Sequence, residues 1–254
     1  MIGRWVAAGT LACLLLGSGW EIPPAAAQWE VIQRRDRLVV GVKDNLPPLG
    51  FRDRQGALVG FEVEIARQLA QDLLGDASKV ELVPLRNAER FEALWEGRVD
   101  LVIAQVTLTR NRSRVVTFSP PYYTAQSVVI VPRSRRPEQP PDTIAVLRGS
   151  NVIPMVQFHH PQAQTIGIGS YAEGIAALTR GQVSALAGDR LALHQWLIDN
   201  PDYTTLAPIG SHSLAIAMPR GLDHYPLHER LSQSVERLRQ SGWLRDRAQF
   251  WRLP

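Results

Sequence analysis

The chain has 254 residues, of which 45% are hydrophobic, and a formal net charge of +4, so it can form one large domain or two small ones with a substantial core. Its basic residues are scattered along the sequence, apart from one arginine run between prolines. Since no zinc-finger, RNA-recognition or basic-zipper pattern occurs, composition and charge argue against a nucleic-acid partner.

The first 27 residues have the features of a secretory signal peptide. Arg4 supplies the positive charge, residues 5–16 are apolar but too few to span a bilayer, and Ala27 ends a small-residue cleavage site. Cys13 suggests a lipoprotein site only faintly, because more leucines follow it. Cleavage after Ala27 leaves an exported chain without cysteine, and therefore without a disulfide or a thiol nucleophile.

The mature chain opens with a strand and a helix. Residues 38–42 (LVVGV) predict a buried strand, after which Lys43 and Asp44 stand at the point where the strand ends. Residues 60–74 predict a helix, because an apolar residue recurs at every fourth position and two glutamates occupy the first turn, where they suit the helix dipole.

A second strand and a second helix follow. Residues 79–85 alternate apolar and polar side chains, as a strand does, and residues 87–95 predict a helix with Asn87 as its N-cap. Arg90 then falls in the first helical turn, where a cation opposes the helix dipole. It either pairs with a surface acid or faces a cleft and meets an anion, and periodicity does not decide between the two.

The next stretch is the most informative part of the sequence. Residues 99–106 form an apolar, β-branched run typical of a buried strand, and Thr107 and Thr109 place hydroxyls where that strand ends. Arg112 follows at once. Because ligands of open α/β sheets sit outside the carboxyl ends of the strands, this edge is a candidate anion site in which Arg112 binds a carboxylate.

The second half of the chain repeats the pattern. An apolar run at residues 127–131 leads into a proline-rich connector at 132–142 and a strand at 143–147, after which Ser150 is the predicted N-cap of a helix that ends near residue 160. Further strands are predicted at residues 164–168, 183–187, 206–209 and 213–218. Further helices are predicted at residues 171–179, 190–198, 227–242 and 243–251. The pattern predicts an α/β fold with two lobes, the first completed by the C-terminal helices.

Several motifs, in this order and spacing, resemble those of the family 3 bacterial extracellular solute-binding proteins, the periplasmic receptors of polar amino-acid ABC importers. The likeness covers residues 38–251. Its motifs are GFEVEI at residues 60–65, VDL at 99–101, TLT with Arg112 at 107–112, FS and PY at 118–122, GS at 149–150 and GD at 188–189.

The resemblance implies an α/β, two-lobed periplasmic-binding-protein-like (type II) fold with two hinge strands that closes over its ligand. On this basis we expect residues 28–126 with 215–254 to form lobe 1, and residues 127–214 to form lobe 2. A permease of the inner membrane is the expected partner, and the protein is expected to be a periplasmic monomer with no cofactor, metal or enzymatic activity.

The resemblance also implies a role for each site residue. The ligand α-carboxylate is expected to bind Arg112, whose planar guanidinium matches it in charge and shape. A surface arginine and simple helix caps are the alternative interpretations of the same residues. The other expected contacts are the Thr107 hydroxyl, the backbone of Gln105, the N–H groups of Ser150 and Asn151, the adjacent Gly149, and the Asp189 carboxylate, which accepts the ammonium.

The resemblance further favours an acidic ligand, glutamate ahead of aspartate. Lys43 and Arg90 occupy positions at which glutamate and aspartate receptors of this family carry cationic ligands for the side chain. Asn87 stands where other members carry an aromatic residue, and Asp44 is the one obvious acid that a cationic ligand could meet. Glutamine or another polar amino acid is the alternative ligand.

Two other functions fit the same fold. A periplasmic dehydratase would need a closely placed acid and base, for which Asp44 and Asp189 are weak candidates. A ligand-sensing module without transport is the second alternative.

Overall fold

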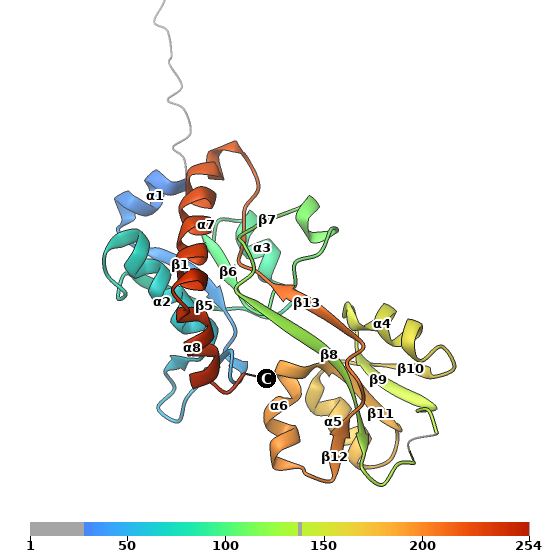
Figure 1. Cartoon of the computed structure of the whole chain (residues 1–254). Coiled ribbons are helices and arrows are strands. Elements are labelled where there is room, and N and C mark those ends of the chain that lie inside the picture. Colours follow the sequence, from blue (N-terminus) through green and yellow to red (C-terminus); the bar gives the residue numbers. More distant parts are fainter. Residues whose placement is uncertain (1–27, 137–138, 254) are drawn as a thin grey trace, which may run out of the picture.

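The computed structural model describes residues 28–136 and 139–253, so the predicted signal peptide lies outside the described residues. Two lobes are joined by two antiparallel strands (Figure 1). Each lobe has a central sheet covered by helices on both faces, which confirms the predicted two-lobed α/β fold. Among these residues no helix is both long and apolar enough to cross a membrane.

The first sheet has β1 near its centre, with parallel neighbours on both sides. Its side chains alternate between two apolar layers: Val40 and Val42 pack on one face, and Val39 packs on the other. Burial on both faces explains why this strand is apolar throughout. In spatial order the sheet contains β5 (Val80–Pro84), β1 (Leu38–Val42), β6 (Leu101–Ile103), β14 (Ala217–Met218) and β7 (Thr117–Phe118).

Helices from both ends of the chain cover one face of this sheet, and α3 lies against the other (Figure 1). A small antiparallel sheet of three short strands, β2, β3 and β4, follows β1 and leads into α2. The bounds are α1 (Gln28–Arg35), β2 (Asn45–Leu46), β3 (Gly50–Arg52), β4 (Leu58–Val59), α2 (Phe61–Leu74), α3 (Arg90–Trp95), α7 (Tyr225–Gln240) and α8 (Trp243–Phe250). The predicted helix at residues 60–74 is therefore confirmed.

The second sheet is built in the same way. It has the order β10, β9, β11, β8 and β12, with β13 paired to β8, and α4 covers one face while α5 and α6 cover the other. Its elements are β8 (Tyr123–Pro132), β9 (Thr143–Leu147), α4 (Val152–His159), β10 (Gln164–Ile168), α5 (Tyr171–Thr179), β11 (Ala185–Asp189), α6 (Arg190–Asp199), β12 (Tyr203–Thr205) and β13 (Gly210–Leu214).

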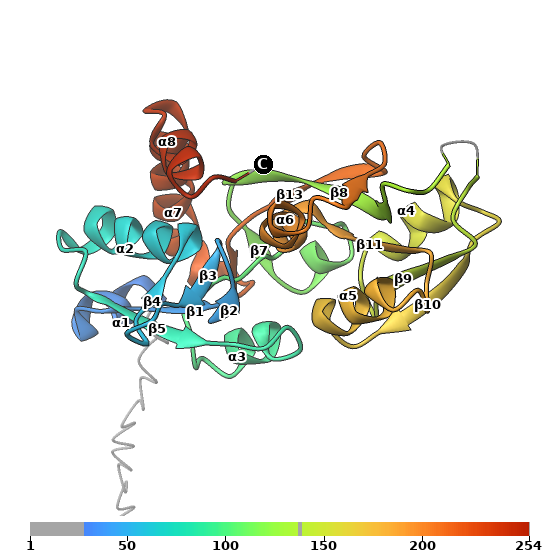
Figure 2. The same cartoon turned by 90° about the horizontal axis from the view of Figure 1, so that it is seen from below.

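The strands β8 and β13 connect the lobes, and we call them the hinge strands. They pair in antiparallel register from Ser127 with Gly210 to Tyr123 with Leu214. Figure 2 shows them running between the two lobes. This arrangement places the polar residues that follow β6 opposite those that precede α4, with the hinge strands along one side.

The strand predicted at residues 206–209 is absent, since β12 ends at Thr205 and β13 begins at Gly210. Two further predictions are corrected nearer the cavity. The helix predicted from Asn87 begins at Arg90, and its N-cap is Glu89, which makes no side-chain capping hydrogen bond. The strand predicted over residues 99–106 is shorter, because Gln105 has a positive φ of 52° that ends the extended backbone after β6. Both corrections lie beside the candidate site.

Gly60 fixes the turn between β4 and α2, and we expect Gly60→Ala to destabilise the protein more than any ordinary left-handed glycine would. Its φ is 128°, and an added Cβ would lie 2.3 Å from the carbonyl oxygen of Leu49, a backbone atom with no freedom to move aside. Gly56 is the matched control, since it also has a positive φ but nothing within 4 Å of the added atom. Gly56→Ala should cost about 1 to 2 kcal/mol, and urea denaturation should show a larger loss for Gly60→Ala. Equal losses would contradict the steric argument.

Candidate functional site

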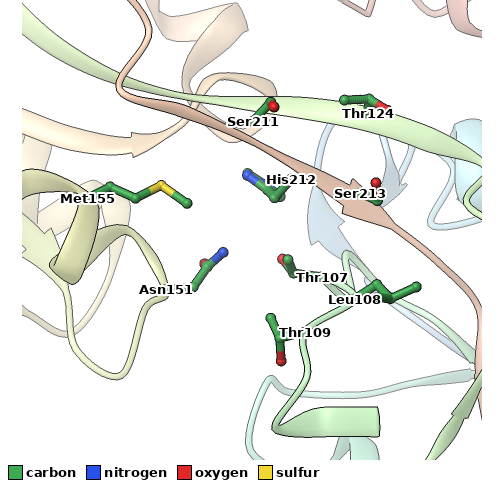
Figure 3. Close-up of a pocket in the computed structure, with 9 residues that line it drawn as sticks. All are labelled: Thr107, Leu108, Thr109, Thr124, Asn151, Met155, Ser211, His212 and Ser213. Atoms are coloured by element: carbon green, nitrogen blue, oxygen red, sulfur yellow. The ribbon is translucent and has the colours of Figure 1, made fainter.

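A cavity of about 360 Å³ lies between the lobes, beside the hinge strands (Figure 3). The loop after β6 supplies one wall, the start of α4 supplies the opposite wall, and the hinge strands close the side. Most of the residues that line it carry a hydroxyl, amide or imidazole group, which can bind a small polar ligand. The lining residues are Thr107, Leu108, Thr109, Thr124, Asn151, Met155, Ser211, His212 and Ser213.

The loop that carries Thr107 and Thr109 is fixed to the hinge strand β13. Thr107 forms a β-bridge with Leu214, and the Leu108 N–H donates to the Ser213 carbonyl at 2.8 Å. The hydroxyls of this wall therefore stand on a backbone that is held in place before any ligand arrives.

Arg112 follows this loop in a 3₁₀ turn, Arg112–Arg114. Its Nη1 donates to the Thr107 carbonyl at 3.0 Å, and its guanidinium lies 5.8 Å from the centre of the Phe91 ring. Burial lowers its pKa, yet within residues 28–136 and 139–253 no carboxylate lies within ion-pair distance of it. A half-buried guanidinium with free donors is suited to bind a carboxylate.

Glu62 is a part of the site that sequence reasoning placed only in the first turn of a helix. It is fully buried, and its Oε1 accepts from the Gln105 N–H at 2.8 Å and from the Tyr122 hydroxyl at 2.5 Å. Its Oε2 is buried without a hydrogen-bond partner, and burial raises the pKa of the carboxyl group. The contact with Gln105 holds the backbone at its positive φ, immediately before the cavity wall.

Gln105, predicted to offer its carbonyl to the ligand ammonium, is held from the other side by Arg90. The Arg90 Nη1 donates to the carbonyls of Ala104 at 2.7 Å and of Gln105 at 3.1 Å, and its Nε donates to the Asn87 carbonyl at 3.0 Å. The residue is 7% exposed, and burial lowers its pKa to about 10. Arg90 therefore binds strand-end carbonyls in this structure.

Lys43 is placed in a similar way. It is buried, and its Nζ donates to the Leu85 carbonyl at 3.1 Å. Burial, and after it the positive charge of Arg90, lowers the lysine pKa. Both predicted side-chain ligands thus lie at the carboxyl ends of strands, close to Glu62, and their contact with a ligand carboxylate stays a prediction.

The other two residues predicted in the first lobe lie nearer to solvent. Asp44 pairs with Arg52, whose Nε is 3.7 Å from the carboxylate. Asn87 is exposed, and the contact that the structure assigns to it is its carbonyl, which accepts from Arg90. Neither side chain is among those that line the cavity.

On the second lobe, Asn151 lines the cavity at the start of α4. The prediction that Ser150 is the N-cap is wrong, because α4 begins at Val152 and its N-cap is Asn151. Ser150 lies one residue earlier, and its Oγ accepts from the Val152 N–H at 3.1 Å. Gly149 precedes it with a φ of 68°. Gly149, Ser150 and Asn151 therefore form a polar edge of the second lobe that faces the first lobe.

Asp189 is both a helix cap and the hydrogen-bond partner of a buried histidine. Its Oδ1 accepts from the Leu191 N–H at 2.8 Å at the start of α6, and its Oδ2 lies 2.8 Å from His212 Nε2. Only 6% of the residue is exposed. Through His212, which lines the cavity, the carboxylate is connected to the same site as Thr107 and Asn151.

Known proteins are similar to this chain over most of its length. Residues 38–253 match the family model described as bacterial extracellular solute-binding proteins, family 3. The chain is 31% identical over 183 residues to a glutamine-binding protein of Geobacillus stearothermophilus, with 70% of each chain covered. It is 27% identical over 218 residues to the glutamine-binding protein GlnH of an ABC transporter of Bacillus subtilis, covering 83% of this chain and 79% of that one.

A solved structure shows the same fold. The solute receptor for L-cysteine of Neisseria gonorrhoeae superposes with a TM-score of 0.76 at 28% identity, covering 89% of this chain and 94% of that one. This similarity confirms the predicted type II periplasmic-binding-protein-like fold.

Proposed function

The chain belongs to the bacterial extracellular solute-binding proteins, family 3, and we propose from that premise that it binds an amino acid between its lobes and delivers it to an ABC permease. Arg112 is the observation that carries the proposal. A guanidinium with no carboxylate partner among the described residues stands beside a polar cavity, where an α-carboxylate would complete its hydrogen bonds. Asp189 on the other lobe supplies the opposite charge for the ammonium.

The positions of these two charges explain closure. A zwitterion held by Arg112 on one lobe and by Asp189 on the other makes contacts with both lobes only when they approach each other. Since a ligand shifts an equilibrium only through its differential affinity for the two states, these bridging contacts stabilise the closed form. The permease then recognises the closed, loaded receptor outside the cytoplasm, and we expect the receptor to act as a monomer.

Local charge supports a ligand with an acidic or an uncharged polar side chain. Arg112, Arg90 and Lys43 belong to the first lobe, and the buried acid that interacts with Lys43 and Arg90 is Glu62. A cationic side chain would therefore meet excess positive charge. We propose glutamate ahead of aspartate, with glutamine as the alternative that the names of two relatives support.

Titration calorimetry tests this ligand class. The mature protein is unfolded and refolded to remove any carried ligand, and is then titrated with glutamate, aspartate, glutamine, cystine and arginine. Glutamate or aspartate should bind, and Lys43→Ala should weaken glutamate far more than glutamine, because an uncompensated buried carboxylate costs several kcal/mol. Equal weakening would contradict the side-chain assignment, and tight arginine binding would contradict the charge argument.

Enzymatic activity is not part of the proposal. Asp44 is paired with Arg52 and does not line the cavity, so it gives Asp189 no acid or base partner there. Incubation with a prephenate-like substrate should give no product, and measurable turnover would favour the dehydratase alternative.

A further inference from the structure

His212 lies on the hinge strand β13 and joins three adjacent strands through its imidazole. Its Nε2 is 2.8 Å from the Asp189 carboxylate on β11, and its Nδ1 is 3.4 Å from the Ser127 hydroxyl on β8. Ser127 is paired with Asp189 in the β-ladder, and His212 is paired with Ala125, two residues along β8. All three side chains are buried, while His212 also borders the cavity (Figure 3).

The proton positions follow from the partners. Because a carboxylate only accepts, Nε2 must carry a hydrogen. Nδ1 can then accept from the Ser127 hydroxyl when the ring is neutral, or donate to its oxygen when the ring is charged. The hydroxyl accommodates both states by rotating, so the imidazole can gain or lose a proton without moving.

The same three residue types form the catalytic triad of many hydrolases, but this cluster has no such role. Ser127 is 0% exposed, so no substrate carbonyl can reach its oxygen. The cluster instead connects the cavity to the charge of Asp189.

We infer that His212 is a positioning residue for the ligand ammonium, acting through Asp189 and making amino-acid affinity depend on its own protonation. The inference rests on the proposed function, in which Asp189 accepts the ammonium. One carboxylate oxygen already accepts from Leu191, and the other is shared with His212. A neutral ring leaves the full negative charge of Asp189 to the ammonium, whereas an imidazolium at 2.8 Å neutralises it.

The charged surroundings of His212 support this dependence. Among the described residues, Asp189 is the ionisable partner within hydrogen-bond distance, and the cavity lining around the ring is uncharged. Arg190, next along α6, donates to Gln126 on β8. Tyr122 and Tyr123 lie near Asp189, but both stay neutral below pH 8. Burial raises the pKa of each phenol, with a further contribution from Glu62 at Tyr122 and from Asp189 at Tyr123.

The test is calorimetric titration of the mature, ligand-stripped protein with L-glutamate and L-glutamine at intervals between about pH 5.5 and 8, the range in which histidine titrates. Because binding favours the neutral ring, wild-type affinity should fall on acidification, approaching tenfold for each pH unit below the midpoint. His212→Gln should bind more weakly at neutral pH, with a flat profile. His228→Gln is the matched control, because His228 sits on α7 and contacts the Phe118 carbonyl, so it should keep the wild-type slope.

A second measurement needs no variant. Titrations of wild type near pH 6.5 in buffers of different ionisation enthalpy should show that binding releases protons. A flat wild-type profile, no proton release, or the same slope in His212→Gln would overturn the inference while leaving the receptor function intact. If wild type binds no amino acid at any pH, the proposed function itself fails.

Discussion

Arg112→Ala should abolish amino-acid binding while leaving the protein folded. The substitution removes the guanidinium that is proposed to hold the α-carboxylate, a group that every amino-acid ligand shares. Truncating one member of a buried, hydrogen-bonded charge pair costs about 2 to 5 kcal/mol, which corresponds to a loss of affinity of at least about thirtyfold. Calorimetric titration with glutamate and glutamine measures this loss, and both ligands should be affected equally.

Arg114→Ala provides the matched control. Arg114 lies in the same 3₁₀ turn, but its side chain is exposed, and the contact that the structure gives it is through its carbonyl, which accepts from Arg220. This variant should bind as wild type does. Arg112→Lys should recover only part of the affinity, because an ammonium lacks the planar pair of donors. Wild-type binding by Arg112→Ala would remove the central residue of the proposed site.

Glu62→Leu should cause the largest loss of stability, about 3 to 5 kcal/mol. The change leaves the Gln105 N–H and the Tyr122 hydroxyl without their acceptor in a buried place, and removes a carboxyl group that interacts electrostatically with Lys43 and Arg90. Denaturant unfolding measures the loss. Glu64→Leu, two residues along α2, is the control: Glu64 is partly exposed, its pair with Arg247 spans 3.8 Å, and the change should cost less than about 1 kcal/mol.

The stability difference between wild type and Glu62→Leu depends on pH, and the pKa of Glu62 defines the sign of that dependence. Burial raises the pKa of Glu62 in the folded state, so its contribution to stability is complete below the ordinary carboxyl range and decreases as pH rises through the raised pKa. The stability difference between wild type and Glu62→Leu should therefore be larger at about pH 5 than at about pH 8. A difference that grows with pH would mean that the carboxylate is stabilised by Lys43 and Arg90 more than burial penalises it.

Local sequence patterns predicted most of the elements and the polar segment that follows β6. The side chains of β1 alternate between two apolar layers, and the apolar residues of α2 recur at every fourth position. Both patterns are short-range and can be seen without knowledge of the rest of the chain. The run from β6 to Arg112 likewise places hydroxyls and a guanidinium beyond a strand end, and the structure brings Thr107 to the cavity with Arg112 hydrogen-bonded to it.

Tertiary structure alone decided which polar groups are buried together. The contacts that define the site join residues far apart in the chain: Glu62 and Tyr122 are separated by 60 positions, and Ser127 and His212 by 85. Glu62 has the sequence pattern of an exposed acid in the first turn of a helix. Its burial is tolerated because the Gln105 N–H and the Tyr122 hydroxyl, from distant segments of the chain, donate hydrogen bonds to it. The same holds for Lys43, whose partner is the carbonyl of Leu85 on a neighbouring segment. Periodicity reports the face on which a residue lies, whereas the cost of burying a charge depends on partners that only the folded chain assembles.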